Sequence, residues 1–248
     1  AGAAPQEEAL NFDFSGGGAF VDGFVAAAGQ LVNASQAGAI WSAVEVLRRV
    51  EMINHLVSQL LLRLPGLREE ALPAQVNAMS DFVLSWQAAP RNLPGPTGEL
   101  NQLILEPRGM LLCIQQGPQS MCDGIRQLIA ALLCGNTVVQ VSSLPVDISD
   151  LLQKAGLGSV YSRIALQSGL KLQSLLLAGE IQGVAISGPH CLVRWVDGVL
   201  ASREGALRPL IVETNGPALI HRFVLEKAIS NNTTASGGNA SLLAMEDS

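Results

Sequence analysis

The sequence predicts an α/β domain with a mainly parallel sheet over about residues 105–215, preceded by helices. Short apolar runs alternate with helical patterns after about residue 100, which is typical of βαβ units. The runs TVV (137–139) and GVAI (183–186) are continuously apolar, as expected for strands covered on both faces of a sheet. Between residues 40 and 60, apolar side chains recur at steps of three and four, which indicates a helix.

The individual elements follow from these periods and from the Gly and Pro residues between them. A first helix is expected from about Ser35 to Pro65, a second over 72–87, and a breaker-rich connector over 91–99. Strands are expected over 103–106, 110–115, 137–142, 159–166, 183–187 and 209–213. Helices are expected over 120–133, 148–155, 171–178, 191–201 and, for the segment FVLEKAI, 223–229.

Composition excludes several classes of function. Only 15% of the residues are charged in a chain that is 48% hydrophobic, which favours a surface covered by other protein. The net charge is −6 and no basic run exists, so we expect no nucleic-acid binding. The sequence shows no signal peptide and no apolar run of membrane-spanning length, so a cytoplasmic location is expected by default. The cysteines are expected to be buried free thiols rather than a metal site, and these are Cys113, Cys122, Cys134 and Cys191.

Four segments, in order, resemble motifs of the aldehyde dehydrogenase superfamily over roughly residues 40–220. They are EPRGMLLCI (106–114), IAALLCGNTVVQVSS (129–143), IQGVAISG (181–188) and PLIVETNG (209–216). The tail NTTASGGNASLLAM (232–245) resembles the terminal motif of proline utilization A (PutA) flavoenzymes, and LPGPTGELN (93–101) resembles a segment of their C-terminal domain. The chain is therefore similar to the C-terminal, aldehyde-dehydrogenase-like domain of long PutA proteins.

The resemblance implies a Rossmann-like sheet and a role within a larger polypeptide. The parent would carry an FAD-dependent proline dehydrogenase and an NAD-dependent glutamate-semialdehyde dehydrogenase, and it converts proline to glutamate. This chain would bind no cofactor and would contact the glutamate-semialdehyde dehydrogenase domain of the same polypeptide. It would seal the tunnel that carries the intermediate and would support assembly. Peripheral membrane association is allowed for the parent only. Two alternatives stay open: part of a live NAD-dependent aldehyde dehydrogenase, or a diverged nucleotide-binding module.

Matching the family motifs residue by residue indicates a degenerate site. The oxyanion-holding Asn of the family falls on Pro118, and its ribose-contacting Lys falls on Val141. Pro189 and Val193 replace a Ser and a Gly in the turn that receives the pyrophosphate. Glu213 matches the general base, but no Cys nucleophile follows it, so we interpret Glu213 as a strand-end carboxylate bonded to nearby backbone.

The tail is predicted to be a docking motif that closes the channel against the dehydrogenase domain; a mobile polar terminus is the alternative. The motif residues are Asn232, Thr233, Gly237, Gly238, Asn239, Ser241 and Leu242. The expected organisation is an irregular N-terminal segment, a helical segment with its connector, the Rossmann-like α/β domain and the docking motif, over 1–35, 36–99, 100–230 and 231–248 respectively.

Overall fold

The computed structural model describes residues 36–116, 121–142, 147–165 and 172–232. Its centre is a five-stranded parallel sheet with the strand order β5-β4-β3-β6-β7. The strands are β3 (Met110–Gln115), β4 (Thr137–Ser142), β5 (Tyr161–Ala165), β6 (Ile181–Ser187) and β7 (Leu210–Ile211). Because the chain runs outward from β3 to β5 and then returns beside β3 with β6, the sheet is doubly wound. The predicted α/β fold with a mainly parallel sheet is confirmed.

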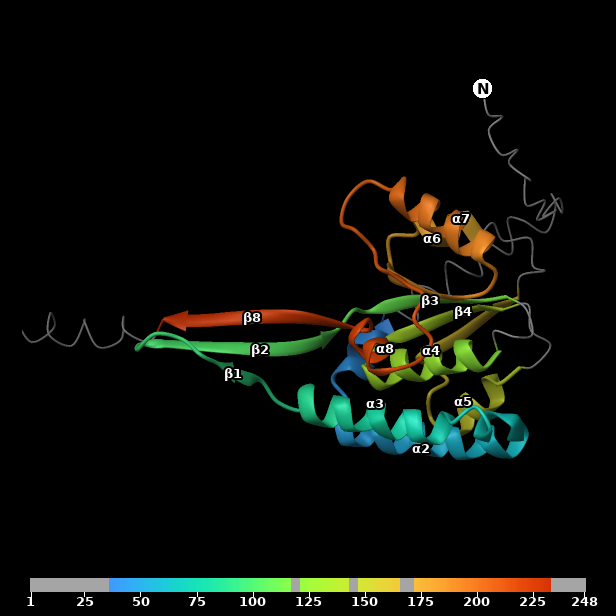
Figure 1. Ribbon diagram of the computed structural model, residues 1–248, viewed down its shortest axis with the longest axis horizontal. Helices are drawn as coiled ribbons and strands as arrows, with labels where there is room; N and C mark the ends of the chain where they lie inside the picture. The colour runs from blue at the N-terminus through green and yellow to red at the C-terminus, as the bar shows by residue number, and fades with distance from the viewer. Residues whose placement is uncertain (1–35, 117–120, 143–146, 166–171, 233–248) are drawn as a thin grey trace, which may run out of the picture.

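Helices cover both faces of this sheet (Figure 1). One face packs against α4 (Met121–Leu133) and α5 (Ser149–Lys154), and the other against α6 (Leu172–Leu177) and α7 (His190–Ala201). Successive residues of β3 point to opposite faces, so Leu111 joins the first apolar cluster and Leu112 joins the second. Both side chains are fully buried. The continuous apolar strands seen in the sequence are thus explained by a sheet with two covered faces.

A layer of N-terminal helices packs outside α4. Its members are residues 36–42, α2 (Val46–Arg63), the 3₁₀ helix η1 (Pro65–Arg68) and α3 (Leu72–Trp86). The single helix expected from Ser35 to Pro65 is wrong in one respect, since the chain turns at 43–45. The Trp41 indole N–H donates to the carbonyl of Leu132 in α4, at 3.1 Å. This tertiary bond holds helix 36–42 against α4, and the axis of α2 does not continue the axis of that helix.

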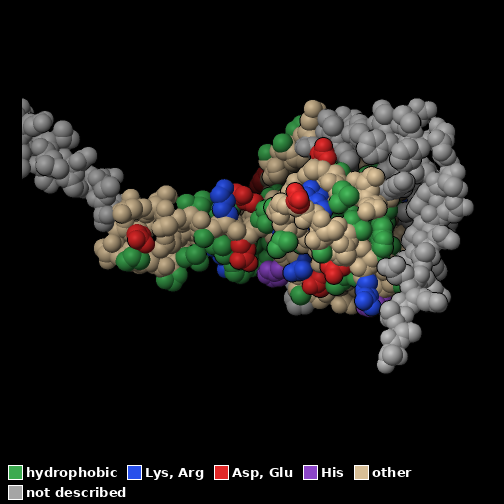
Figure 2. Space-filling model, turned by 90° about the horizontal axis from the view of Figure 1, so that it is seen from above, with side chains coloured by type: hydrophobic (Ala, Val, Ile, Leu, Met, Phe, Trp, Pro, Cys, Tyr) green, Lys and Arg blue, Asp and Glu red, His purple; other side chains and the backbone are tan. Residues whose placement is uncertain are grey.

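Three strands form a second, antiparallel sheet that projects from the body, which we call the arm (Figures 1 and 2). The arm consists of β1 (Arg91–Leu93), β2 (Glu99–Pro107) and β8 (Val224–Asn232), in the order β1-β2-β8. The segment 91–99, expected as a connector, therefore contributes β1. The strand expected at 103–106 lies within β2 and belongs to the arm, outside the parallel sheet. Both β2 and β8 extend across boundaries expected from the sequence, at 99/100 and 230/231.

The helix expected over 223–229 is wrong, because this segment forms β8. Its Leu, Glu, Lys and Ala residues favour a helix in isolation. In the structure, however, β8 pairs with β2 along its whole length, from Glu99–Asn232 to Pro107–Val224. Lys227 also forms an ion pair with Glu106 across the two strands, at 3.1 Å. A continuous ladder of main-chain hydrogen bonds overrides the weak local preference. Among the described residues, the helix that comes just before this segment is the short α8 (Pro217–His221).

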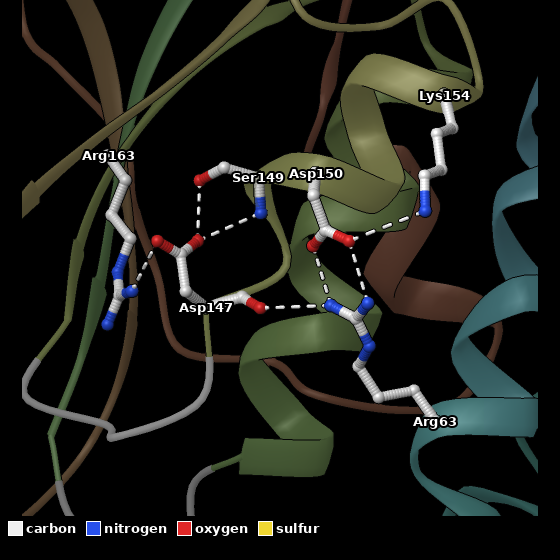
Figure 3. A network of polar contacts seen from close by, with 6 residues as sticks. All are labelled: Arg63, Asp147, Ser149, Asp150, Lys154 and Arg163. Atoms are coloured by element: carbon white, nitrogen blue, oxygen red, sulfur yellow. Dashed lines mark hydrogen bonds and ion pairs between the residues drawn. The ribbon is translucent and has the colours of Figure 1, made fainter.

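A polar network fixes α5 between α2 and β5 (Figure 3). Arg63, the last residue of α2, donates to both carboxylate oxygens of Asp150 and to the backbone carbonyl of Asp147. The Asp147 carboxylate accepts hydrogen bonds from the N–H and the hydroxyl of Ser149, at 2.9 and 2.6 Å. Asp147 also pairs with Arg163 of β5, at 3.2 Å. The network therefore supplies a hydrogen-bond acceptor for the Ser149 N–H in the first turn of α5. It also joins α2, α5 and β5.

Candidate functional site

The doubly wound sheet places the expected site at the carboxyl ends of β3 and β6, where the strand order reverses. The two ends are joined by a hydrogen bond from the Gln116 N–H to the Ser187 carbonyl, at 3.0 Å. Both Gln115 and Ser187, the last residues of these strands, are buried. Pro118, the position matched to the oxyanion donor, lies outside the described residues.

The turn between β6 and α7 is the position at which a pyrophosphate would meet a helix N-terminus. Pro189 occupies the N-cap with an extended backbone and, as a proline, offers no N–H. The backbone N–H groups of Leu192 and Val193 donate to the Pro189 carbonyl, at 3.0 and 3.2 Å. The Val193 side chain packs against the apolar cluster under α7. At this turn, proline therefore removes one backbone donor, and the Val193 side chain occupies space where the family has a glycine.

Val141 lies near the end of β4 and is 2% exposed, packed in the cluster beneath α6 and α7. A valine side chain has no hydrogen-bonding group, so this position supplies packing to the core and no contact to a ribose hydroxyl.

Glu213 lies just beyond β7 and is held by two neighbours. Its carboxylate accepts a hydrogen bond from the Val212 N–H at 3.2 Å and pairs with Nε of Arg222 at 3.3 Å. Arg222 follows α8 and also donates to the carbonyl of Leu210, at 3.4 Å. The sequence interpretation of Glu213 as a carboxylate bonded to nearby backbone agrees with this geometry. The arginine partner was missed, because nothing in the sequence indicates that α8 folds back against β7.

A buried glutamine connects the carboxyl ends of β6 and β7. The Nε2 group of Gln127, on α4, lies within hydrogen-bonding distance of the carbonyls of Ile186, Ile211 and Glu213, at 3.2, 3.3 and 3.1 Å. Since β7 has only two paired residues, this side-chain contact supplements a short ladder. Nothing in the sequence singles out Gln127 beyond its place in an apolar helix.

The cysteines are only partly as expected. Cys113 and Cys134 are buried, and burial raises the pKa of the Cys113 thiol to about 12 and also raises that of Cys134. Cys122 is half-buried. Cys191 is exposed in the first turn of α7, which corrects the expectation of four buried thiols; it points away from the core because Leu192 and Val196 fill the inner face of that helix. Among the described residues, no three metal-binding side chains converge, and no helix is long and apolar enough to span a membrane.

Two cavities lie at the opposite, amino-terminal edge of the sheet, near the root of the arm. One, of about 490 Å³, is lined by the start of α2, the end of α3 and the end of β2. The other, of about 540 Å³, adjoins the first strand residues Met110 and Thr137. Ser42, Glu106 and Pro107 line both cavities.

The arm carries the beginning of the predicted docking motif. Asn232 ends β8 and pairs with Glu99. The remaining motif residues lie outside the described residues, and they are Thr233, Gly237, Gly238, Asn239, Ser241 and Leu242. Three leucines on the arm are exposed by about two fifths, namely Leu93, Leu100 and Leu225. The sequence motif thus begins where a projecting sheet with apolar side chains ends.

Similar sequences all belong to one kind of protein. The chain is 33% identical over 156 residues to the bifunctional protein PutA of Salmonella typhimurium and 31% identical over 155 residues to that of Escherichia coli. Each match covers 62% of this chain but only 11% of the relative, so the chain spans a small part of the proteins that it resembles. No protein-family model matches the chain.

Similar structures agree with the sequence matches. A PutA with proline bound in remote sites superposes with a TM-score of 0.61 and 24% identity, over 77% of this chain and 22% of that protein. A PutA from Bradyrhizobium japonicum gives a TM-score of 0.61 at 25% identity, with the same coverage. An NAD-dependent benzaldehyde dehydrogenase from Corynebacterium glutamicum, at 16% identity and a TM-score of 0.57, shares the fold over 74% of this chain and 45% of its own. The chain is thus similar to part of the PutA proteins, and it has an α/β fold that it shares with aldehyde dehydrogenases.

Proposed function

We propose that this domain is non-catalytic and that it closes the substrate channel and supports assembly of a bifunctional proline dehydrogenase and glutamate-semialdehyde dehydrogenase. The parent would use FAD and NAD, and this chain would use neither. The proposal draws on the relatives named bifunctional PutA, of which the chain matches about a ninth. The cytoplasmic location stays a prediction of the sequence.

The observation that carries the proposal is the arm. It projects from the α/β body (Figure 1), and its strand β8 ends at Asn232, the first residue of the tail motif. Within the described residues β8 is an edge strand of this sheet, so one row of its backbone groups is available to another chain or domain. Leu100 and Leu225 are 39% and 44% exposed. Such a projecting, partly apolar sheet is suited to contact a neighbouring domain.

The expected catalytic positions support a structural role. Glu213 is paired with Arg222, and Val141 is a core residue. Pro189 lacks the N–H that a phosphate would need. A domain that closes a channel needs complementary surface rather than catalytic groups, because its task is to keep a reactive intermediate away from bulk water.

The test is deletion of residues 232–248 in the full-length protein, followed by measurement of the coupled conversion of proline to glutamate. A closing role predicts a lag before NADH appears, or loss of the second activity, because the intermediate escapes, while proline dehydrogenase activity persists. Deletion of only 246–248, which leaves Leu242 and Leu243 in place, is the matched control and should leave the kinetics unchanged. Unaltered coupled kinetics and an unaltered assembly state after the longer deletion would exclude the closing role.

A further inference from the structure

The cavity at the start of α2 has the size of a small-molecule site. Its volume is about 490 Å³, within the range of about 300–1,000 Å³ that such sites occupy. It lies between α2, the end of α3 and the root of the arm, at the edge of the sheet opposite the cofactor position. Its polar lining consists of Ser42, Glu45, Arg49, Gln87 and Glu106.

Arg49 is the unusual member of this lining. The residue is 3% exposed, yet within the described part of the chain its guanidinium makes a single hydrogen bond, from Nη2 to Oε1 of Gln87 at the long distance of 3.5 Å. Its Nε and Nη1 atoms are buried and have no hydrogen-bond partner among the described residues. Leaving a guanidinium buried without a carboxylate is costly, because its lost hydration is not replaced.

Arg126, another buried arginine of this fold, is paired with carboxylates. Arg126 is 5% exposed and pairs with Asp123 at 2.7 Å and with Glu70 at 3.1 Å. Arg49 has no such ion pair among the described residues. Gly135, which follows α4, lacks the Cβ that would overlap Nη1, so the backbone leaves room for the Arg49 guanidinium beside the second cavity. A cationic group is thus held between two cavities without a fixed anion.

The charges around the first cavity define which ligand charges would match its lining. Glu106 is already paired with Lys227, at 3.1 Å. Glu45 is exposed and forms no ion pair among the described residues, although it precedes Arg49 by only one helical turn. One positive and one negative group therefore remain unmatched in the lining. A simple anion would meet the repulsion of Glu45, whereas a ligand that carries both charges would not.

A second unpartnered group lies in the adjoining cavity. The Thr137 hydroxyl is buried and has no hydrogen-bond partner among the described residues. Thr137 lines the cavity of about 540 Å³, which shares Ser42, Glu106 and Pro107 with the first. Two buried side chains with unpartnered polar atoms thus border two adjoining cavities.

We propose that the cavity beside Arg49 binds a small zwitterion of the amino-acid class, with its carboxylate at Arg49 and its ammonium group toward Glu45. The proposal does not rest on the function proposed above, because the site borders only the root of the arm and uses neither the exposed leucines of the arm nor the carboxyl edge of the sheet. It identifies a ligand by charge and size alone.

Hydrogen–deuterium exchange on the full-length protein tests the site directly. L-alanine, acetate and methylamine serve as probes at equal ionic strength, and the readout is exchange in the peptides that cover 45–51 and 84–88. L-alanine is expected to slow exchange at the lowest concentration, acetate to need a higher one, and methylamine to have no effect. Absence of protection by both carboxylates would overturn the proposal.

Three variants assign the effect to the named side chains. Arg49→Met should weaken L-alanine binding about tenfold or more, the factor for one charge-assisted hydrogen bond. Arg48→Met is the matched control, since Arg48 is exposed and pairs with Glu51, and it should change nothing. Arg49→Lys keeps the charge and should bind better than the methionine variant, which separates loss of charge from a packing defect. Undiminished protection in Arg49→Met would overturn the proposal.

A fourth variant tests the preference for a zwitterion over a simple anion. Glu45→Gln should abolish the preference for L-alanine over acetate, because the negative group that faces the ammonium is gone. A preference that survives this substitution would overturn the assignment of Glu45.

Discussion

At the scale of single residues, Asn136 is the most fully bonded side chain at the root of the arm. Its Oδ1 accepts the backbone N–H groups of Arg108 and Gly109, at 2.7 and 3.1 Å. Its Nδ2 donates to the carbonyls of Ala131 and Phe223, at 3.0 and 2.9 Å. These bonds join the end of α4 to both points at which the arm leaves the body, and they use the full capacity of the amide.

Asn136→Ala should lower the free energy of unfolding by about 2–4 kcal/mol, because it leaves buried backbone groups without partners. Asn92→Ala is the matched control. Asn92 is exposed and accepts one hydrogen bond from Gln102, so its loss should change stability by less than about 0.5 kcal/mol. Chemical denaturation of the two variants measures the difference; equal losses would contradict the role given to Asn136.

At the scale of elements, the arm shows where local preference and tertiary pairing disagree. β8 contains helix-favouring residues but pairs with β2 over nine positions, and its other edge has no strand beside it within the described residues. In an antiparallel pair, successive N–H groups of an edge strand alternate between the partner strand and the free edge. The two neighbouring residues Ala228 and Ile229 therefore differ in what their N–H groups bond.

Two proline substitutions test this alternation, Ala228→Pro and Ile229→Pro. Proline has no N–H. Replacing the residue whose N–H bonds to β2 should therefore expose the backbone of 99–107 to faster hydrogen exchange. The other variant loses only an edge N–H and serves as the control. Equal exchange in both variants would contradict the edge position of β8, whereas β3 and β4 should keep their protection in each.

At the scale of the whole molecule, the fold retains a dinucleotide-binding topology while its expected cofactor positions carry other side chains. Pro189 supplies no N–H at the helix start, Val193 packs against the core and Val141 is buried. Glu213 is joined to Arg222. Under the function proposed above, the doubly wound sheet would serve as a scaffold for the arm and for the helical layer.

We accordingly expect no useful NAD binding by the 248-residue chain. The prediction is checked by isothermal titration calorimetry with NAD, with a live aldehyde dehydrogenase titrated in parallel as a positive control. A micromolar dissociation constant, about 8 kcal/mol of binding free energy, would contradict it and would favour the diverged nucleotide-binding module.

Much of the fold was predictable because the period of apolar residues reports local geometry. The strands at 110–115 and 137–142 and the helix at 72–86 lie where the sequence predicts them. The order of these elements, with short connections, was enough to predict a parallel sheet. For the candidate site, the substitutions at Val141, Pro189 and Val193 were legible from the motif positions alone. What those residues contact was not, because the contacts are made between segments distant in sequence.

The sequence by itself determined the α/β class, the strand and helix positions of the body, and the family resemblance, because all of these depend on local pattern. Only the tertiary structure decided that 223–229 is a strand, that Arg222 pairs with Glu213 and that Arg49 is buried without an anion. Each of these depends on two segments far apart in the chain. A ladder of main-chain bonds, an ion pair and a buried charge exist only once both segments are in place, so no local pattern predicts them.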